Sequence, residues 1–124
     1  MIYLDTHVVI WLYARRLGLL SERVRRLLED RELLVSPMVL LELDFLREIG
    51  RIAEGGHAVY QNLHARIGLR VCTLAFPRIV EAASLQSWTR DPFDRVIVGH
   101  ASAGGRELVT RDETIHRNYS RALW

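Results

Sequence analysis

Two short apolar runs, one near each end of the chain, lead directly into aspartates. Residues 2–4 (Ile-Tyr-Leu) are followed by Asp5, and residues 108–111 (Leu-Val-Thr-Arg) are followed by Asp112. Short apolar runs of this kind are typical of buried strands in a parallel sheet. The carboxyl ends of parallel strands meet at one edge of the sheet, where functional groups gather. We therefore expect both acids at that edge.

Helical segments separate these two runs from further ones, and the alternation predicts the fold class. We expect strands at residues 2–4, 33–35, 69–74 and 107–110, with a small edge strand at 122–124. We expect helices at residues 8–15, 21–29, 37–49, 57–67, 77–85, 92–103 and 114–119. This pattern predicts an α/β domain with three layers, α/β/α, around a mainly parallel sheet of four or five strands. A chain of 124 residues without a linker or a repeat is expected to form one domain over residues 1–124.

The composition excludes several classes of protein. All 17 basic residues are arginine. A biased genome composition is sufficient to explain this, but the absence of lysine still excludes P-loop proteins and Schiff-base enzymes. No apolar run approaches the ~20 residues of a membrane span, and the first residues do not resemble a signal peptide. Cys72, the only cysteine, is interpreted as a small buried hydrophobe. We expect no intrachain disulfide, no membrane association and a cytoplasmic location.

Glu42 is the acid with the most unusual neighbours. On the helix expected at residues 37–49, the positions three and four residues away are all apolar, namely Met38, Val39, Phe45 and Leu46. A solvated glutamate normally has polar neighbours. Glu42 is therefore expected to point into a partly buried site, where an unpaired charge is costly. The alternative is a buried ion pair with an arginine.

Asp91 and Asp94 open the helix expected at residues 92–103. Asp91 precedes a proline, so N-capping explains it fully. Asp94 falls at the third helical position, where the helix dipole also favours an acid. Its later neighbours Ile97 and Val98 are apolar. We therefore place Asp94 in the candidate site and leave Asp91 as a cap and accessory residue.

The joint pattern of the acids points to a metal site. Each one has a simpler explanation alone, since Asp5 and Asp112 both suit helix N-caps. Together the carboxylates would repel one another, and a divalent cation is the usual compensation. Carboxylate oxygens suit Mg²⁺ or Mn²⁺, and the five histidines show no zinc-ligand spacing. The candidate ligands are Asp5, Glu42, Asp94 and Asp112, with Thr6, Thr110 and Asp91 as accessory residues.

Read together, these residues resemble the PIN-domain ribonucleases, and among them the VapC-type toxins of prokaryotic toxin–antitoxin pairs. The matching stretches, in the family's order and spacing, are Leu4–His7 with Trp11, Ser36–Leu43, Asp91–Ile97, Leu108–Asp112 and Ala122–Trp124. They span nearly the whole chain. One departure is His7, because many relatives carry a small hydroxyl residue after the Asp-Thr pair.

The resemblance implies an endoribonuclease that acts as a toxin. In the family, three or four acids hold one or two Mg²⁺ or Mn²⁺ ions, which activate water for hydrolysis of RNA phosphodiester bonds. These acids map onto Asp5, Glu42, Asp94 and Asp112. The resemblance also implies a homodimer that is inhibited by a co-encoded antitoxin protein.

Two kinds of contact surface are expected beside this site. Residues 21–29 and 37–49 are expected to supply an apolar groove for a partner helix. RNA phosphates would be held by arginines near the expected site edge. These candidates are Arg15, Arg16, Arg90, Arg95 and Arg111.

Two other functions compete with this interpretation. A phosphatase would use Asp5 as its nucleophile, but position 7 is histidine where one familiar phosphatase class has a second aspartate, and that class also needs a lysine. A non-catalytic PIN-like module that binds RNA or protein would have a decayed site. All four acids are present, which argues against decay. A protein that binds no Mn²⁺ would favour the non-catalytic module.

Overall fold

The centre of the protein is a five-stranded sheet in which every pairing is parallel. A computed structural model describes all 124 residues. The strands are β1 (Ile2–Leu4), β2 (Leu33–Val35), β3 (Arg70–Val71), β4 (Leu108–Val109) and β5 (Ala122–Leu123), in the order β3-β2-β1-β4-β5. The predicted α/β fold with a parallel sheet is therefore confirmed.

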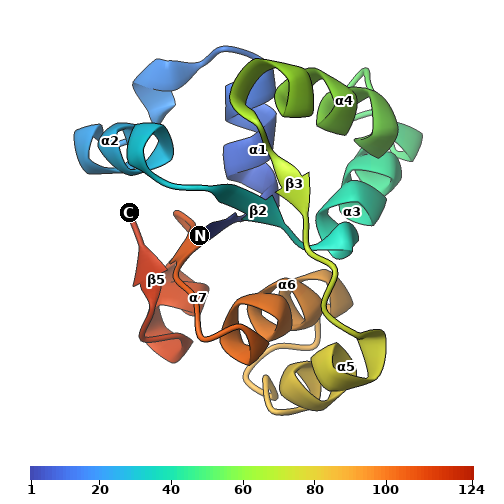
Figure 1. Cartoon of the computed structure of the whole chain (residues 1–124). Coiled ribbons are helices and arrows are strands. Elements are labelled where there is room, and N and C mark those ends of the chain that lie inside the picture. The colour runs from blue at the N-terminus through green and yellow to red at the C-terminus, as the bar shows by residue number, and fades with distance from the viewer.

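Helices cover both faces of this sheet. They are α1 (Thr6–Tyr13), α2 (Glu22–Asp30), α3 (Pro37–Glu48), α4 (Gly56–Ile67), α5 (Phe76–Ser84), α6 (Pro92–Ala103) and α7 (Glu113–Asn118), with one 3-10 turn, η1 (Leu17–Leu19). Figure 1 shows α1 to α4 on one side of the strands and α5 to α7 on the other. The predicted three-layer arrangement follows from this placement. None of the helices combines the length and the apolar character needed to cross a membrane.

The central strands β1 and β2 are buried along their whole length. Their side chains join one apolar core with residues from α1, α3, α4 and α6. Because parallel strands are covered on both faces, a continuous apolar run is the pattern that such strands need. Residues 2–4 and 33–35 have this pattern, and for that reason the sequence predicts both strands.

Capping side chains fix where several helices begin. Ser21 accepts a hydrogen bond from Val24 N, and Ser36 accepts one from Met38 N. Gly68 ends α4 with a left-handed backbone, at φ 70°, as the sequence predicts. The helix expected at residues 8–15 instead begins at Thr6, because Asp5 takes the cap position.

The third strand is shorter than the expected span of residues 69–74. Only Arg70 and Val71 pair as a strand, although Cys72 N still donates to Val35 O. The chain then turns toward α5, and Leu74 N lies 3.5 Å from the Cys72 sulfur. The strand expected at residues 107–110 is likewise reduced to Leu108–Val109.

Gly56 allows α3 and α4 to approach closely. A Cβ atom built at this position would lie 2.3 Å from the carbonyl oxygen of Leu40. The Gly56 amide also donates to the Asp44 carboxylate at 2.8 Å. Since the obstructing atom belongs to the backbone of α3, the two helices would have to move apart to admit a methyl group.

We expect Gly56→Ala to lower the free energy of unfolding by about 1–3 kcal/mol, the usual cost of overpacking. Urea denaturation would measure it. Gly18→Ala is the matched control, because a Cβ there meets no heavy atom within 4 Å. Equal stability of the two variants would contradict the close-packing argument.

Candidate functional site

Asp5 lies at the carboxyl edge of the sheet, between β1 and α1. It is only 6% exposed. Its Oδ1 accepts a hydrogen bond from Thr6 N at 2.8 Å, and its Oδ2 accepts one from the Thr110 hydroxyl at 2.6 Å. Burial raises the pKa of Asp5 above its ordinary value, while the two hydrogen bonds oppose that shift. Both oxygens of this buried carboxylate are thus held in place.

Glu42 lies on α3 and is half-buried. The Thr6 hydroxyl donates a hydrogen bond to its Oε1. Burial raises the pKa of Glu42, the Thr6 hydrogen bond lowers it, and the charges of Asp5 and Asp91 raise it further. Thr6 therefore joins two candidate ligands, with its backbone on Asp5 and its hydroxyl on Glu42.

The alternative explanation of Glu42, a buried ion pair with arginine, is wrong. Only two ion pairs exist in the structure, Arg26–Glu22 and Arg31–Glu107. No arginine balances Glu42.

Asp94 is the acid that most needs an explanation. It lies in the first turn of α6, is half-buried, and has no hydrogen-bond or ion-pair partner. Its pKa is raised to about 7, first by burial and then by four neighbouring acids, which are Asp91, Asp5, Asp112 and Glu42. The acids that follow β1, lie on α3, precede α6 and follow β4 are therefore close enough to raise the pKa of Asp94.

Asp112 and Asp91 are exposed and both cap helices. Asp112 Oδ1 accepts from Ile115 N at 2.9 Å, and Asp91 Oδ1 accepts from Phe93 N at the same distance. Asp112 follows the end of β4 by three residues, and its own amide donates to the Thr110 hydroxyl. Capping therefore explains both positions, yet both carboxylates also face Asp94 closely enough to raise its pKa.

The donor chemistry of this cluster fits Mg²⁺ or Mn²⁺. All the charged groups are carboxylates, and such oxygens are the ligands that these ions prefer. As placed, no three of the chain's Asp, Glu, His and Cys side chains converge on one point that would enclose an ion. Carboxylates repel one another, so closer approach requires a counter-charge.

A buried polar pair fixes α3 relative to α6. Ser36, the first residue after β2, lies with its Oγ 2.8 Å from His100 Nδ1. Both side chains are buried, and burial lowers the pKa of His100. Ser36 is also the cap of α3, since its Oγ accepts from Met38 N. Its partner on α6 has no signal in the sequence, because the two are 64 positions apart.

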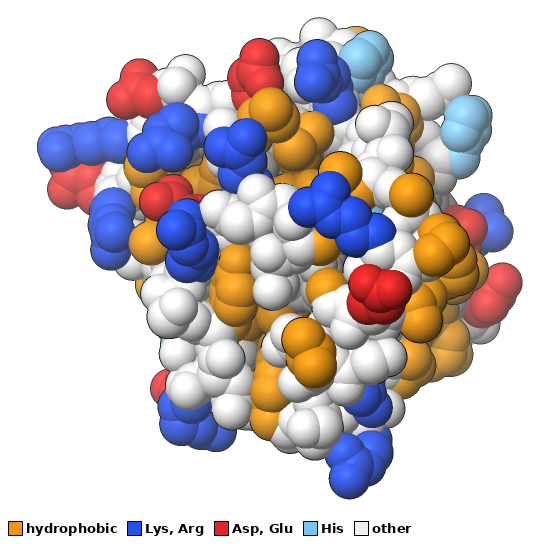
Figure 2. Space-filling view, turned by 60° about the horizontal axis from the view of Figure 1, so that its bottom comes forward, with side chains coloured by type: hydrophobic (Ala, Val, Ile, Leu, Met, Phe, Trp, Pro, Cys, Tyr) orange, Lys and Arg blue, Asp and Glu red, His pale blue; other side chains and the backbone are white.

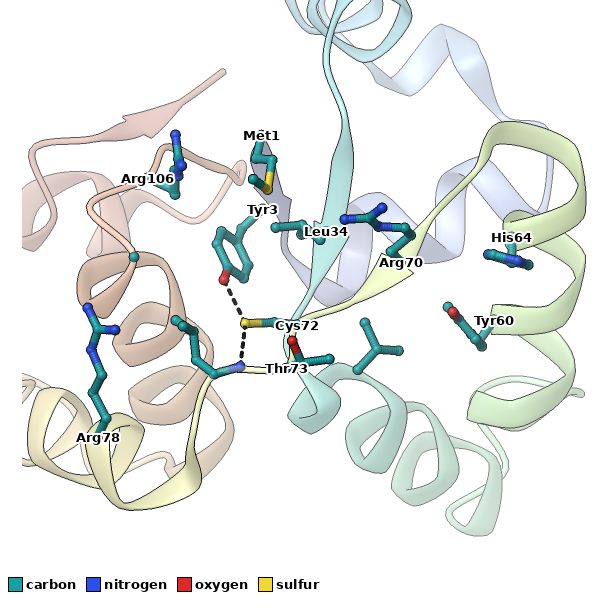
Figure 3. A pocket seen from close by; sticks show the side chains of 13 residues that line it. Met1, Tyr3, Leu34, Tyr60, His64, Arg70, Cys72, Thr73, Arg78 and Arg106 are labelled. Atoms are coloured by element: carbon teal, nitrogen blue, oxygen red, sulfur yellow. Dashed lines mark hydrogen bonds between the residues drawn. The ribbon is translucent and has the colours of Figure 1, made fainter.

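A cavity of about 740 Å³ lies at a different place on the molecule (Figure 3). Its lining includes Arg70, Arg78 and Arg106 and no carboxylate. Met1 and Arg106, which also line it, precede β1 and β4, so this part lies toward the amino ends of the strands. The Tyr3 hydroxyl donates to the Cys72 sulfur at 2.8 Å within this cavity. This lining offers no carboxylate to a divalent cation, and size alone does not make it the reaction centre.

Comparison with known proteins places the chain in context. A family model for the PIN domain matches residues 2–120. A search of curated proteins gives no match.

Several solved structures are similar over nearly their whole length. A VapBC complex from Rickettsia felis bound to a promoter DNA fragment is 19% identical, with a TM-score of 0.69, covering 100% of this chain and 98% of that one. A toxin–antitoxin complex from Klebsiella pneumoniae is 15% identical, with a TM-score of 0.67, covering 100% and 97%. DNA-bound VapBC from Salmonella typhimurium is 23% identical, with a TM-score of 0.65, covering 98% and 96%. At these identities the likeness shows a shared fold.

The raised pKa of Asp94 predicts a dependence of stability on pH. The unfolded chain releases this proton near pH 3.8, whereas the folded metal-free protein keeps it to about pH 7. Stability from this group therefore falls as the pH rises between those values, and the full penalty applies above pH 7.

We expect Asp94→Asn to raise the melting temperature of the metal-free protein at pH 8 by roughly 4 °C or more, as about 1 kcal/mol does in a domain of this size. The gain should shrink toward pH 5. Thermal unfolding in EDTA would measure it, with Glu48→Gln, an exposed acid on the same α3 as Glu42, as control. A lower melting temperature for Asp94→Asn at pH 8 would contradict the proposed crowding of charge.

Proposed function

Because the chain belongs to the PIN domain family, we propose that it is a metal-dependent endoribonuclease and the VapC-type toxin of a toxin–antitoxin pair. One observation carries the proposal. Asp94 is a half-buried carboxylate without a partner, and burial, followed by the charges of four further acids, raises its pKa to about 7. A fold keeps such an arrangement at a cost, which is typical of a functional site.

We assign the metal ligands to Asp5, Glu42, Asp94 and Asp112. A bound Mg²⁺ or Mn²⁺ would supply a water of lowered pKa and would neutralise phosphate charge. The chain's own part is to position the ligands. Thr110 and the Thr6 amide hold both oxygens of Asp5, and the Thr6 hydroxyl holds one oxygen of Glu42.

The arginines divide into structural ones and free ones. Arg95 donates to the carbonyls of Ala83 and Ser84, and Arg90 donates to Ser87 O, so both tie the α5–α6 connection together. Arg111 is exposed and makes no hydrogen bond or ion pair. Figure 2 shows arginines spread over one face of the molecule among acids and apolar side chains, rather than one continuous basic surface. We therefore favour Arg111 over Arg90 and Arg95 for contact with RNA.

Exposed apolar side chains support the proposal of protein partners. Leu41 and Phe45 on α3, and Ile49 at its C-terminal cap, are between 44% and 56% exposed, and this side of α3 suits a homodimer contact. The hollow found over the first of the two segments expected to form a groove, residues 21–29, is lined mainly by polar residues, and its lining includes no residue of 37–49. An apolar hollow lies instead between α1 and the start of α4, lined by Ile10, Tyr13, Ile52 and Val59 among others. We propose it as the seat of an antitoxin segment.

The remaining assignments stay predictions. They are a single PIN domain over residues 1–124 and a cytoplasmic location. A phosphatase with Asp5 as nucleophile fits poorly, because position 7 is histidine rather than a second aspartate and the chain has no lysine. A non-catalytic binding module would not explain why several acids lie close together without a positively charged partner.

We expect purified protein to cleave a mixed RNA substrate with Mg²⁺ or Mn²⁺ and not with EDTA. Asp94→Asn and Asp5→Asn should each lower the rate at least about 100-fold, since loss of a ligand should exceed the 10- to 100-fold cost of losing its supporting contacts. Gel electrophoresis of the products gives the measurement, and Glu48→Gln should cleave normally. Full activity of Asp94→Asn under metal-controlled conditions would contradict the assignment of Asp94 as a metal ligand.

The hydrogen bond from Thr110 to Asp5 makes a separate prediction. Thr110→Val removes the donor at nearly constant volume, so cleavage should fall about 10- to 100-fold and Mn²⁺ affinity should weaken. Thr110→Ser keeps the hydroxyl and should retain most activity. Cleavage rates and calorimetric titration with Mn²⁺ test both variants. If serine and valine behave alike, the hydroxyl does not position Asp5.

A further inference from the structure

An aromatic and cationic row of side chains runs beside the acidic cluster. The His7 and Trp11 rings are 6.1 Å apart between centroids, and the Trp11 and Trp124 rings are 5.8 Å apart in an edge-to-face arrangement. The Arg111 guanidinium carbon lies 5.9 Å from the centre of the Trp124 ring. Four side chains from α1, the β4–α7 turn and the end of β5 thus form one contiguous surface, called here the aromatic row.

The aromatic row begins at the acids. His7 is two residues after Asp5, in the first turn of α1, the helix that Asp5 caps. Arg111 directly precedes Asp112. Trp124 follows β5, which pairs with β4, so it lies at the same carboxyl edge of the sheet. The row therefore extends from the acidic cluster toward the β5 side of that edge.

The members of the row are open to a ligand. His7 and Arg111 are exposed, while Trp11 and Trp124 are half-buried and packed against the core. A half-buried indole is held rigidly and still offers ring surface, which lowers the entropy cost of stacking. Arg111 has no carboxylate partner, so its guanidinium can contact phosphate while stacking on an aromatic ring.

This combination matches the chemistry of a single-stranded nucleic acid. Bases stack on aromatic rings, and arginine contacts the backbone between them. In a duplex the bases stack on one another and expose no faces for such contact. The row contains no carboxylate or amide that would read one base edge, and stacking tolerates every base.

We propose that His7, Trp11, Trp124 and Arg111 form a stacking platform that binds the nucleotides next to the cleaved bond in unpaired RNA. The inference rests on the proposed ribonuclease function and names its substrate class as single-stranded segments. Arg111 contacts a phosphate, and the rings take one or two bases. His7 stands where many relatives of similar sequence have a small hydroxyl residue. Its ring adds surface at the end of the row nearest the acidic cluster.

Binding of a short fluorescein-labelled RNA, measured by anisotropy in EDTA with the cleavage-silent Asp94→Asn protein, tests the platform. Trp124→Leu should weaken binding about 5- to 100-fold, the effect of losing one stacked base, and Trp124→Phe should recover most of it. Arg111→Ala should lower the salt dependence by about one counterion, whereas Arg26→Ala on α2 should not. The same RNA in a duplex should bind more weakly than the single strand.

The third tryptophan provides an internal control. Trp88 lies outside the row, and its indole Nε1 donates a hydrogen bond to Gln86 Oε1. In a Trp88→Phe protein only Trp11 and Trp124 remain as emitters, and single-stranded RNA should quench their fluorescence. Thermal unfolding must show that the variants are folded. If Trp11→Leu fails to fold, Trp124→Leu and Arg111→Ala still test the proposal at the surface.

Equal affinity of Trp124→Leu and its parent, or equal affinity for duplex and single strand, would overturn the platform. These outcomes are distinct from failure of the proposed function. That failure would appear as no cleavage by the wild type with either metal, whatever the binding results. Cleavage by the wild type with an unchanged KM in Trp124→Leu would retain the ribonuclease and reject the platform.

Discussion

The hydrogen bonds of Thr6 and Thr110 to the acids hold the candidate site together. A buried carboxylate is costly unless donors surround it, and Asp5 receives two. Thr110 follows β4 and Asp5 follows β1, so their hydrogen bond exists only because these strands are neighbours. The Thr6 hydroxyl extends the link to Glu42 on α3. The arrangement of the candidate ligands therefore depends on the order of the strands. A shift in the β1–β4 register would separate Thr110 from Asp5 and move the ligands apart.

The same cluster opposes folding. Asp94 has no donor, and burial together with the acids around it raises its pKa toward neutrality, so ionisation at physiological pH destabilises the metal-free fold. The rest of the molecule must outweigh that cost through its apolar core, in which β1 and β2 are wholly buried. The Ser36–His100 pair adds a fixed contact between α6, which carries Asp94, and the start of α3, which carries Glu42. Rigid packing behind the acids is what keeps repelling groups at one edge.

Much of this arrangement was predictable because its signals are local. Apolar runs bounded by caps defined β1, β2 and α6, and the apolar neighbours of Glu42 revealed a charge out of place. Strand lengths at the sheet edge were less predictable. β3 contains only two paired residues. The turn after Cys72 ends this strand, rather than a low strand preference of the residues that follow. The Thr6–Glu42 bond and the Trp11–Trp124 contact join residues distant in the sequence, so they required the three-dimensional fold.

The charge of the protein supports the proposed stacking of bases beside the proposed metal site. The formal net charge is only +2, and the carboxylates at the site repel the phosphates that must approach them. Arg90 and Arg95, the arginines nearest Asp94 in sequence, are used by the α5–α6 connection. General electrostatic attraction is therefore weak where the scissile phosphate would lie, and a bound cation corrects it only locally. Contacts with the uncharged part of the nucleotide avoid this conflict, because stacking on Trp11 and Trp124 does not depend on the sign of the field. A weakly basic chain can hold a polyanion against its own acids by combining a cation, an arginine without a hydrogen-bond or ion-pair partner, and aromatic surface.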